Sequence, residues 1–446
     1  MKRRLPLLLF AIVLMSNLIL GLQIGSTFGA NEDKEKDKEK ERDSAYKNIE
    51  LLTSVMEIIR KDYVDGEKLS YQDLTYGALK GMLNGLDPHS QFMEPASYDE
   101  INQETRGQFG GIGVVIGMKD GVITVISPME DTPGFKAGLL PGDKIIRIEG
   151  KSTEKLSLSD AVKQLRGAPD TKVNLTVLRP KSREVKDISV QRAIIKVESV
   201  KDTRLLDDKI GYIRITQFNE PTSDEFEKAL LKLEKEGMTA LVLDLRNNPG
   251  GLLESAVDVA GKFLPKGDLV VSTEGRNPAQ KNLYRVRTGP THPHYPLAVL
   301  INEGSASGSE IVAGALQDTK RAVIVGETSF GKGSVQSVLP LRDGSAIRLT
   351  TAKYYTPSHK VIHEHGVTPD IVVPMSEEDW SHILIQRSQS TLDSVDDKDS
   401  KNNDADKDDK KEVRDVQFDR AADLLKGITI FLQRKNAGAP APSTKT

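Results

Sequence analysis

Strand-like and helix-like segments alternate between Lys209 and Val373, and this alternation constrains the fold more than any other feature. The apolar run at residues 241–245 leads through a glycine turn into a helical pattern at residues 253–263. Strands that alternate with helices predict an α/β core. Because 446 residues exceed one ordinary core, we expect further folded domains and flexible extensions.

A different pattern precedes this region. Residues 107–180 contain short β-branched runs at 114–116, 122–126 and 173–178, which are separated by glycine and proline turns. This pattern predicts a small β-rich module in front of the α/β core.

The first residues have the composition of an export signal. Three basic residues at 2–4 precede an apolar run at 5–22. Such a run is at the lower limit for spanning a bilayer, so a cleaved signal peptide and an uncleaved membrane anchor both stay open for residues 1–30. The absence of cysteine excludes thiol chemistry and disulfides. We therefore predict an extracytoplasmic, periplasmic or cell-envelope protein, secreted or anchored.

The remaining segments are extensions. Residues 31–43 alternate acid and base and predict a charged linker, and residues 391–415 are too polar to bury a core and predict disorder. Helical spacing of apolar residues predicts a helical region at 44–92 and a C-terminal helix at 416–435. The apolar stripes of these helices must be buried, either by packing within the chain or in a homodimer.

The net charge of −3 argues against nucleic acid as a partner.

A serine-rich turn follows the strand-like run at residues 297–301. Ser305, Ser307 and Ser309 lie there, directly before a helical run. A hydroxyl at a strand-to-helix junction is exposed, and the N–H groups of the helix favour developing negative charge. Spacing does not choose among the three serines. Ser307 and Glu310 also fit a capping box that needs no catalysis.

A lysine between two glycines follows the next strand-like run, at residues 322–326. Lys332 becomes a general base if burial disfavours its ammonium form. Serine and lysine pairs are a known arrangement of nucleophile and base. Gln336 lies four residues further on and could orient the amine. The alternative is a solvated lysine in a turn.

Two adjacent glycines, Gly250 and Gly251, end the segment at residues 244–251. Such a pair lets a backbone N–H point into a cleft, as an oxyanion hole requires, although a plain tight turn explains it equally well.

Residues 326–332 match the start of a nucleotide-binding P-loop, but Gly333 replaces the hydroxyl residue that binds magnesium. The scattered histidines predict no metal site, and we expect no cofactor.

Four segments together resemble the carboxy-terminal processing proteases, also called tail-specific proteases. They are residues 86–90, 244–251, 304–310 and 326–336, in the order of that family, and the resemblance covers residues 45–375. It implies an α/β and α+β multidomain fold. This fold has a crotonase/ClpP-like mixed β/α protease core at 191–390, an inserted PDZ domain at 93–190 and helical terminal extensions.

The resemblance also implies the site and its chemistry. The nucleophile would be Ser307, the base Lys332 and the supporting residue Gln336. The oxyanion hole would be the N–H of Gly308 with that of Gly250 or, preferably, Gly251. Relatives usually carry alanine at position 308, so the glycine here is a departure that affects loop rigidity. The chemistry is acyl transfer and requires no metal or nucleotide.

The PDZ-like region would capture substrate tails. Its carboxylate-binding loop would be formed by Gly110, Gly111, Ile112, Gly113 and Val114. A purely structural glycine cluster is the alternative. The implied partners are proteins or peptides with free C-termini, and an activating adaptor protein stays open. The main rival function is a catalytically inactive PDZ scaffold or peptide-binding protein.

Overall fold

The computed structural model describes residues 44–65, 68–119, 121–129, 131–180, 182–277, 279, 281–289, 292–376, 378–383, 386 and 414–437. The chain divides into two compact units, residues 1–86 and residues 87–446. The predicted signal or anchor at 1–30, the linker at 31–43 and most of the predicted disordered segment at 391–415 lie outside the described residues.

The described part of the first unit is helical, as predicted. One helix covers residues 44–62, and α2 spans Tyr71–Asn84. Helix α2 begins with a capping box between Ser70 and Asp73. Ile49 and Leu52 on the first helix are 58% and 41% exposed.

Among the described residues, no helix combines the length and the apolar character needed to cross a bilayer.

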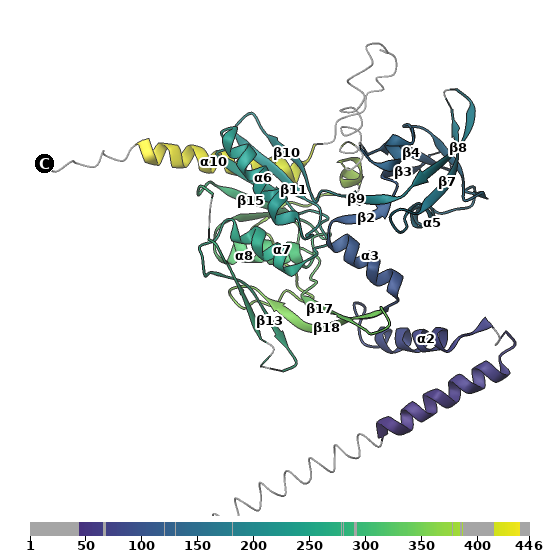
Figure 1. Ribbon diagram of the computed structural model, residues 1–446. Coiled ribbons are helices and arrows are strands. Elements are labelled where there is room, and N and C mark those ends of the chain that lie inside the picture. The colour runs from purple at the N-terminus through teal and green to yellow at the C-terminus, as the bar shows by residue number, and fades with distance from the viewer. Residues whose placement is uncertain are drawn as a thin grey trace, which may run out of the picture. The chain divides into compact units, whose positions relative to one another are not determined.

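The second unit contains the predicted α/β core (Figure 1). Its sheet has the strand order β10-β11-β12-β15-β16-β19, in which β10 is antiparallel to β11 and all other neighbours are parallel. The strands are β10 (Val200–Leu205), β11 (Ile210–Ile215), β12 (Ala240–Asp244), β15 (Leu297–Ile301), β16 (Val323–Gly326) and β19 (Ile371–Val372). The helices are α6 (Thr222–Lys235), α7 (Leu253–Gly261) and α8 (Gly308–Asp318).

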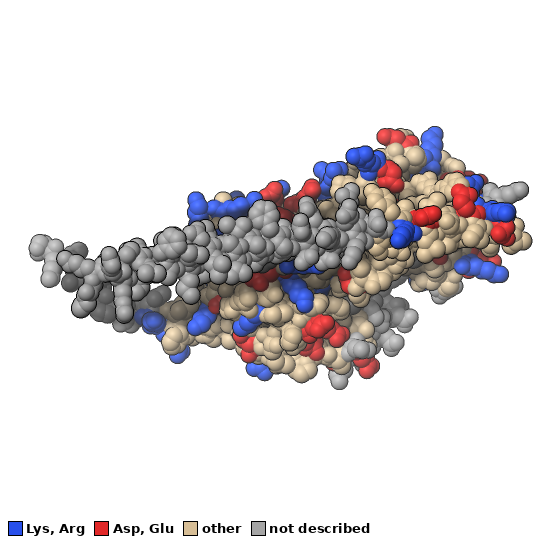
Figure 2. Space-filling model, turned by 90° about the horizontal axis from the view of Figure 1, so that it is seen from below, with Lys and Arg blue, Asp and Glu red and all other residues tan. Residues whose placement is uncertain are grey.

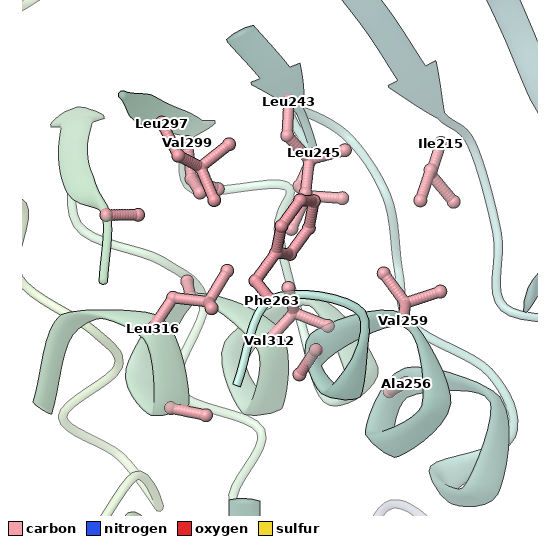
Figure 3. Close-up of a cluster of buried hydrophobic side chains, with 14 of the residues drawn as sticks. Ile215, Leu243, Leu245, Ala256, Val259, Phe263, Leu297, Val299, Val312 and Leu316 are labelled. Carbon is pink, nitrogen blue, oxygen red and sulfur yellow. The ribbon is translucent and has the colours of Figure 1, made fainter. Parts of the chain in front are cut away.

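The alternation of side chains along the strands separates two apolar layers. Leu243 and Leu245 belong to the cluster that packs against α7 and α8, where Val312 and Phe263 meet them (Figure 3). Val242, which directly precedes Leu243 on β12, belongs to the cluster on the opposite face. Because successive side chains of a strand point to opposite faces, the sheet is buried on both sides.

Helix α10 (Val416–Ala437) covers that opposite face, which confirms the predicted C-terminal helix. Leu425 is fully buried there, and the ring of Phe418 meets that of Tyr212 edge-on at 5.3 Å. Further along, Ile430 and Phe431 are 49% and 66% exposed. One part of the apolar stripe therefore packs within the chain.

A second sheet lies beside this core. It has the order β1-β18-β13-β14, with β17 paired to β18. The strands are β1 (Gln91–Met93), β13 (Leu269–Gly275), β14 (Asn282–Arg285), β17 (Ser334–Pro340) and β18 (Ala346–Tyr355). Strand β1 precedes the β-rich module in sequence and yet pairs with β18, which follows it. The module is therefore inserted into the core, as predicted.

The inserted module has its own sheet and core. Its sheet follows the order β3-β4-β5-β7-β8, with β6 on β5, and it packs against α5 (Leu158–Leu165). The strands are β3 (Val114–Lys119), β4 (Val122–Pro128), β5 (Lys144–Ile148), β6 (Lys151–Ser152), β7 (Lys172–Arg179) and β8 (Glu184–Gln191), and a short helix, α4, spans Pro133–Lys136. The chain enters from α3 (Pro95–Thr105) through β2 (Gln108–Gly111) and leaves through β9 (Ala193–Lys196), which pairs with β2.

Acidic and basic side chains are interspersed on the surface seen in Figure 2. The sequence contains 62 basic and 65 acidic residues, which gives the net charge of −3.

Candidate active site

Three loops that carry predicted site residues meet at one edge of the parallel sheet. The loops follow the adjacent strands β12, β15 and β16 and carry Gly251, Ser307 and Lys332 respectively. The carboxyl ends of parallel strands lie at the same edge, which is where α/β sheets place their ligands. The topology therefore brings together residues that are far apart in the sequence.

Hydrogen bonds lock the first two loops to one another. The Asn302 side chain accepts from the Asn247 N–H at 2.8 Å and donates to the Asn247 side-chain oxygen at 2.9 Å. The Ala306 N–H donates to the Asn248 carbonyl at 3.0 Å. These bonds make the two loops a single rigid platform.

The three serines of the second loop have different surroundings. The Ser305 hydroxyl donates to the Leu245 carbonyl at 2.8 Å, and the Ser309 hydroxyl donates to the Asn248 carbonyl at 2.9 Å. Both residues are fully buried. Ser307 lines a cavity that neither of the other two reaches.

The backbone of Ser307 has an unusual conformation, with φ 52° and ψ −107°. An ordinary N-cap residue lies in the extended region, and a left-handed φ is costly for a residue with a Cβ. Strained residues of this kind cluster at functional sites. The capping interpretation therefore does not explain the whole geometry, even though the Glu310 carboxylate accepts from the Ser307 N–H at 2.7 Å.

The cavity has a volume of about 490 Å³. It brings together five of the predicted site residues: Ser307, Lys332, Gln336, Gly250 and Gly251. Its other walls are both apolar and charged: Gln217, Pro249, Leu252, Leu253, Glu254, Tyr284, Val335, Ser337, Arg348 and Tyr354. A concave site on which several polar groups converge is a usual form of a substrate site.

The glycine loop lies directly against the Ser307 turn. A Cβ on Gly250 would lie 2.7 Å from the Ala306 carbonyl oxygen and 2.8 Å from the Gly308 nitrogen, so only glycine fits. The Gly250 N–H donates to the Asn248 side-chain oxygen at 2.9 Å. Within the described part of the chain, the N–H groups of Gly251 and Gly308 donate to no other group. These two donors stay available to a ligand.

Lys332 is half-buried, and its position requires both flanking glycines. Gly331 has φ 89°, and a Cβ on Gly333 would lie 2.1 Å from the His363 nitrogen. Burial lowers the pKa of Lys332 below its ordinary value, and the Arg348 cation lowers it further, whereas Glu310 opposes the shift. Both main effects favour the neutral amine.

The Gln336 side chain, on β17, is held by two hydroxyl groups. Its amide nitrogen donates to Ser334 Oγ at 2.9 Å and to Thr350 Oγ1 at 3.3 Å. Both amide hydrogens are therefore used, and the amide oxygen is the polar atom that is left to accept from another group.

Four of the five predicted tail-binding residues line a separate groove of about 210 Å³ in the inserted module. Gly111, Ile112, Gly113 and Val114 line it opposite Val162 and Leu165 of α5. Gly110 does not line the groove, and its N–H donates to the Gln103 side-chain oxygen at 2.9 Å. Gly113 has φ 71°, and a Cβ there would lie 2.3 Å from Thr132.

Comparison with protein families matches three regions of the chain. Residues 209–373 match Peptidase family S41, residues 100–178 match the PDZ domain, and residues 18–97 match the N-terminal domain of the activating protease CtpB. A carboxy-terminal-processing protease of Bartonella bacilliformis is 44% identical, over 74% of this chain and 76% of that protein. The chain belongs to the carboxy-terminal processing proteases of family S41. The predicted resemblance is thus confirmed, and the chain is a serine peptidase whose substrates are proteins.

Other carboxy-terminal processing proteases are similar over most of their length. The carboxy-terminal processing protease CtpB of Bacillus subtilis is 38% identical over 74% of this chain and 68% of that protein. A carboxyl-terminal-processing protease of Synechocystis is 35% identical over 87% of this chain and 84% of that protein. Among solved structures, the photosystem II D1 C-terminal processing protease is 30% identical with a TM-score of 0.44, over 72% of this chain and 92% of that one.

Sequence reasoning missed four residues around the two sites of this carboxy-terminal processing protease. Glu310 was interpreted only as a cap, yet its buried carboxylate also accepts from the Ser329 hydroxyl at 2.6 Å and the Gly331 N–H at 2.7 Å. Arg348 and Tyr354 line the cavity from β18. Arg166 lines the groove, and its buried Nε has no partner among the described residues.

A signal was present for only one of these residues. The S-x-x-E spacing pointed to Glu310, whereas no local pattern marked the other three, because only the fold places them at the sites.

Burial raises the pKa of Tyr354 to about 12, against the opposing effect of Ser307, so this phenol stays protonated at neutral pH.

Proposed function

We propose that this protease is an exported endopeptidase that recognises protein C-termini through its PDZ domain and hydrolyses peptide bonds with Ser307 and Lys332. The observation that carries the proposal is the shared cavity, which holds Ser307, Lys332 and Gln336 together with Gly250 and Gly251. The likeness to proteases of the same name supports it.

The first half of the reaction forms an acyl-enzyme. Ser307 Oγ attacks the scissile carbonyl carbon while the neutral Lys332 amine takes the hydroxyl proton. The carbonyl oxygen becomes an oxyanion that accepts from the Gly308 and Gly251 N–H groups. The carbon–nitrogen bond then breaks, and Lys332 gives its proton to the leaving amine.

The second half restores the enzyme. A water molecule loses a proton to Lys332 and attacks the acyl carbon, and the same N–H groups stabilise the second oxyanion. When the carbon–Oγ bond breaks, Ser307 receives its proton back from Lys332. Gln336 supports both steps if its amide oxygen accepts from the Lys332 amine and so directs the lone pair of that amine toward Ser307.

The lowered pKa of Lys332 supports its role as a base. A lysine with an ordinary pKa is protonated at neutral pH and has no lone pair to accept the serine proton. Because burial and Arg348 both disfavour the ammonium form, a larger fraction of this lysine is neutral.

The groove between β3 and α5 supports tail capture. A substrate tail would add as a strand along β3, with its carboxylate at the loop of Gly111, Ile112 and Gly113. Arg166, at the same groove, supplies a positive charge for that carboxylate. Two apolar side chains of α5, Val162 and Leu165, provide the wall for an apolar terminal residue.

Peptide cleavage tests the enzymatic proposal. Ser307→Ala and Lys332→Ala should each reduce the hydrolysis of a peptide with an apolar tail by at least about a thousandfold, as expected for loss of a nucleophile or its base. Ser182→Ala and Lys320→Ala change exposed residues and should retain full activity. Full activity in either site variant would rule out the dyad. If the wild type binds tails without cleaving any peptide, the inactive scaffold is correct.

Export concerns the segment at residues 1–30. Its basic start and apolar run support an extracytoplasmic location, with a cleaved or an anchoring signal. Cell fractionation, followed by sequencing of the mature N-terminus, separates the two forms. An activating adaptor and a homodimer belong to the same proposal, and size-exclusion chromatography with light scattering tests the dimer.

A further inference from the structure

The turn at residues 87–90 has no part in the reaction described above, although its sequence was one of the four family-like segments. The Asp87 carboxylate closes this turn. It accepts from the N–H groups of His89 at 2.8 Å and Ser90 at 2.9 Å, and from the Ser90 hydroxyl at 2.6 Å. Three donors on one carboxylate fix the turn firmly.

The same turn is bonded to β18, a strand that borders the active-site cavity. The Thr350 N–H donates to Ser90 Oγ at 3.1 Å, and the Thr350 hydroxyl donates to Asp87 Oδ1 at 3.1 Å. Arg348 Nε donates to the His89 carbonyl at 3.2 Å. Two residues on the same face of β18, Arg348 and Thr350, therefore hold the turn in place.

Thr350 also contacts the site itself, because its hydroxyl oxygen accepts from the Gln336 amide nitrogen at 3.3 Å. A continuous chain of hydrogen bonds therefore runs from Asp87 through Thr350 to Gln336. The second hydrogen of the Gln336 amide goes to Ser334 Oγ at 2.9 Å.

The charge on Asp87 determines which groups donate and which accept along this series of hydrogen bonds. Burial alone raises its pKa, but the hydrogen bonds from Ser90, His89 and Thr350 outweigh that effect, so the pKa of Asp87 is lowered. An ionised carboxylate accepts and never donates. The single hydroxyl hydrogen of Thr350 must therefore point toward Asp87, and only its lone pairs are left to face Gln336.

We propose that Asp87 is a positioning residue for the hydrolytic site and sets the orientation of the Gln336 amide through the Thr350 hydroxyl. With Thr350 acting as an acceptor, the Gln336 NH₂ group faces Thr350 and the amide oxygen is available to the Lys332 amine. This inference rests on the proposed function of Ser307 and Lys332.

The Asp87→Asn variant should loosen the chain without removing atoms. Asp87 Oδ1 accepts from the two backbone N–H groups as well as from Thr350, so an asparagine keeps its oxygen at that position. This oxygen is neutral and holds the Thr350 hydroxyl less firmly than a carboxylate does, so the hydroxyl can turn and donate to Gln336. The Gln336 amide then flips and directs its NH₂ group toward Lys332. A donor that occupies the lone pair of the neutral amine competes with the Ser307 proton, so the base is weakened.

The test compares Asp87→Asn with Asp343→Asn in the full chain, with an apolar-tailed peptide as the substrate. Asp343 is a matched control, because its carboxylate closes a turn by accepting from the Ser345 N–H at 3.1 Å and hydroxyl at 2.6 Å, in the β17–β18 hairpin. We expect kcat to fall on the order of tenfold in Asp87→Asn with KM unchanged, the size of one lost hydrogen bond. Asp343→Asn should leave kcat unchanged. Equal kcat values in the two variants overturn the proposal.

A double-mutant cycle separates positioning from a merely structural role. Asp87→Asn should lower kcat no further in a Gln336→Ala background, because there is no amide left to orient. If the two losses multiply, Asp87 acts independently of Gln336 and the proposal is wrong.

Substitutions at Thr350 keep the test decisive if Asp87→Asn does not fold. Thr350→Ser retains the hydroxyl and should keep near wild-type kcat, whereas Thr350→Val retains the shape without the hydroxyl and should lose on the order of tenfold. Equal activities of these two variants refute the chain of hydrogen bonds from Asp87 to Gln336.

If Ser307→Ala or Lys332→Ala is active, the proposed function fails. If those two are inactive while Asp87→Asn matches Asp343→Asn, only the positioning role fails.

Discussion

The Glu310 carboxylate accepts a hydrogen bond of 2.7 Å from the Ser307 backbone N–H and thereby fixes the strained turn of the proposed nucleophile. The same carboxylate accepts from the Ser329 hydroxyl and the Gly331 N–H, one residue before Lys332. One buried side chain therefore connects the nucleophile loop to the base loop. Burial raises the pKa of Glu310, and the donors around it oppose that shift.

The connection predicts that Glu310→Ala loses activity and stability together. The variant leaves three buried donors without an acceptor, so we expect a loss of about 2–4 kcal/mol in the free energy of unfolding. Urea denaturation followed by circular dichroism measures this loss. Asp318→Ala is the control, because Asp318 ends α8 and accepts from the Ser358 N–H at 2.9 Å and hydroxyl at 2.6 Å. This variant should lose stability without an effect on the active site. A stable and fully active Glu310→Ala variant would contradict the role of Glu310.

The lowered pKa of Lys332 predicts a shift in the pH profile. Activity should fall as the pH decreases through the pKa of Lys332, because the base becomes protonated. Arg348→Gln removes a cation that lowers this pKa, so the acidic limb of kcat/KM should move to higher pH. Arg342→Gln changes an exposed arginine of the same hairpin and should not move it. An unmoved limb in Arg348→Gln would show that Arg348 does not tune Lys332.

The lowered pKa of Lys332 also affects the free energy of unfolding. Since the folded-state pKa lies below the unfolded value, the buried ammonium lowers stability at low pH, and this cost disappears as the pH rises from the folded to the unfolded value. Lys332→Met should therefore be inactive but more resistant to denaturant at neutral pH, with an advantage that shrinks toward pH 10. A constant difference across pH would argue against a depressed pKa.

The packing around Gly250 predicts that a single methyl group there strongly reduces catalysis. A Cβ there would press on the Ala306 carbonyl and the Gly308 nitrogen, and φ is 98°. Gly250→Ala should displace a proposed oxyanion donor and reduce kcat by about 100-fold or more. Gly121→Ala is matched, because φ is 72° but a Cβ meets nothing within 4 Å. Equal activities of the two variants would show that this contact does not position the donor.

The secondary structure was predictable because it depends on local patterns. The strands at residues 241–245 and 297–301 and the helix at 253–263 were correctly predicted from apolar runs and turn residues alone. The choice among Ser305, Ser307 and Ser309 was not predictable, because it depends on which hydroxyls reach carbonyls of a loop about 60 residues away. The contacts of residues 87–90 with β18 are longer in range still, so neither spacing nor periodicity indicates them.

Arg246 lies between Leu245 and Asn248 in the loop after β12 and carries a buried charge. Its guanidinium is fully buried between Asp244 at 2.7 Å and Asp415 at 2.8 Å, the latter beside the start of α10. Arg246→Ala leaves the carboxylate of Asp244 buried without this partner, so we expect a loss of about 3–5 kcal/mol in the free energy of unfolding. Arg287→Ala breaks an exposed pair with Asp258 and should cost about 0–1 kcal/mol. Similar losses in the two variants would mean that the buried pair is not what joins α10 to the sheet.

Tail capture predicts that the terminal carboxylate of the substrate matters and that Arg166 is its counter-charge. Arg166→Ala should raise KM about tenfold for a peptide with a free C-terminus, because one charge-assisted hydrogen bond is lost. Amidation of the peptide should raise KM in the wild type by a similar factor and have little effect in Arg166→Ala, since both changes remove the same interaction. Arg183→Ala, an exposed residue of the β7–β8 turn, should leave KM unchanged. Arg166 also pairs with Glu104 at 3.3 Å, so Glu104→Ala should leave the amidation effect intact. If amidation weakens Arg166→Ala as much as the wild type, the carboxylate is bound elsewhere in the groove.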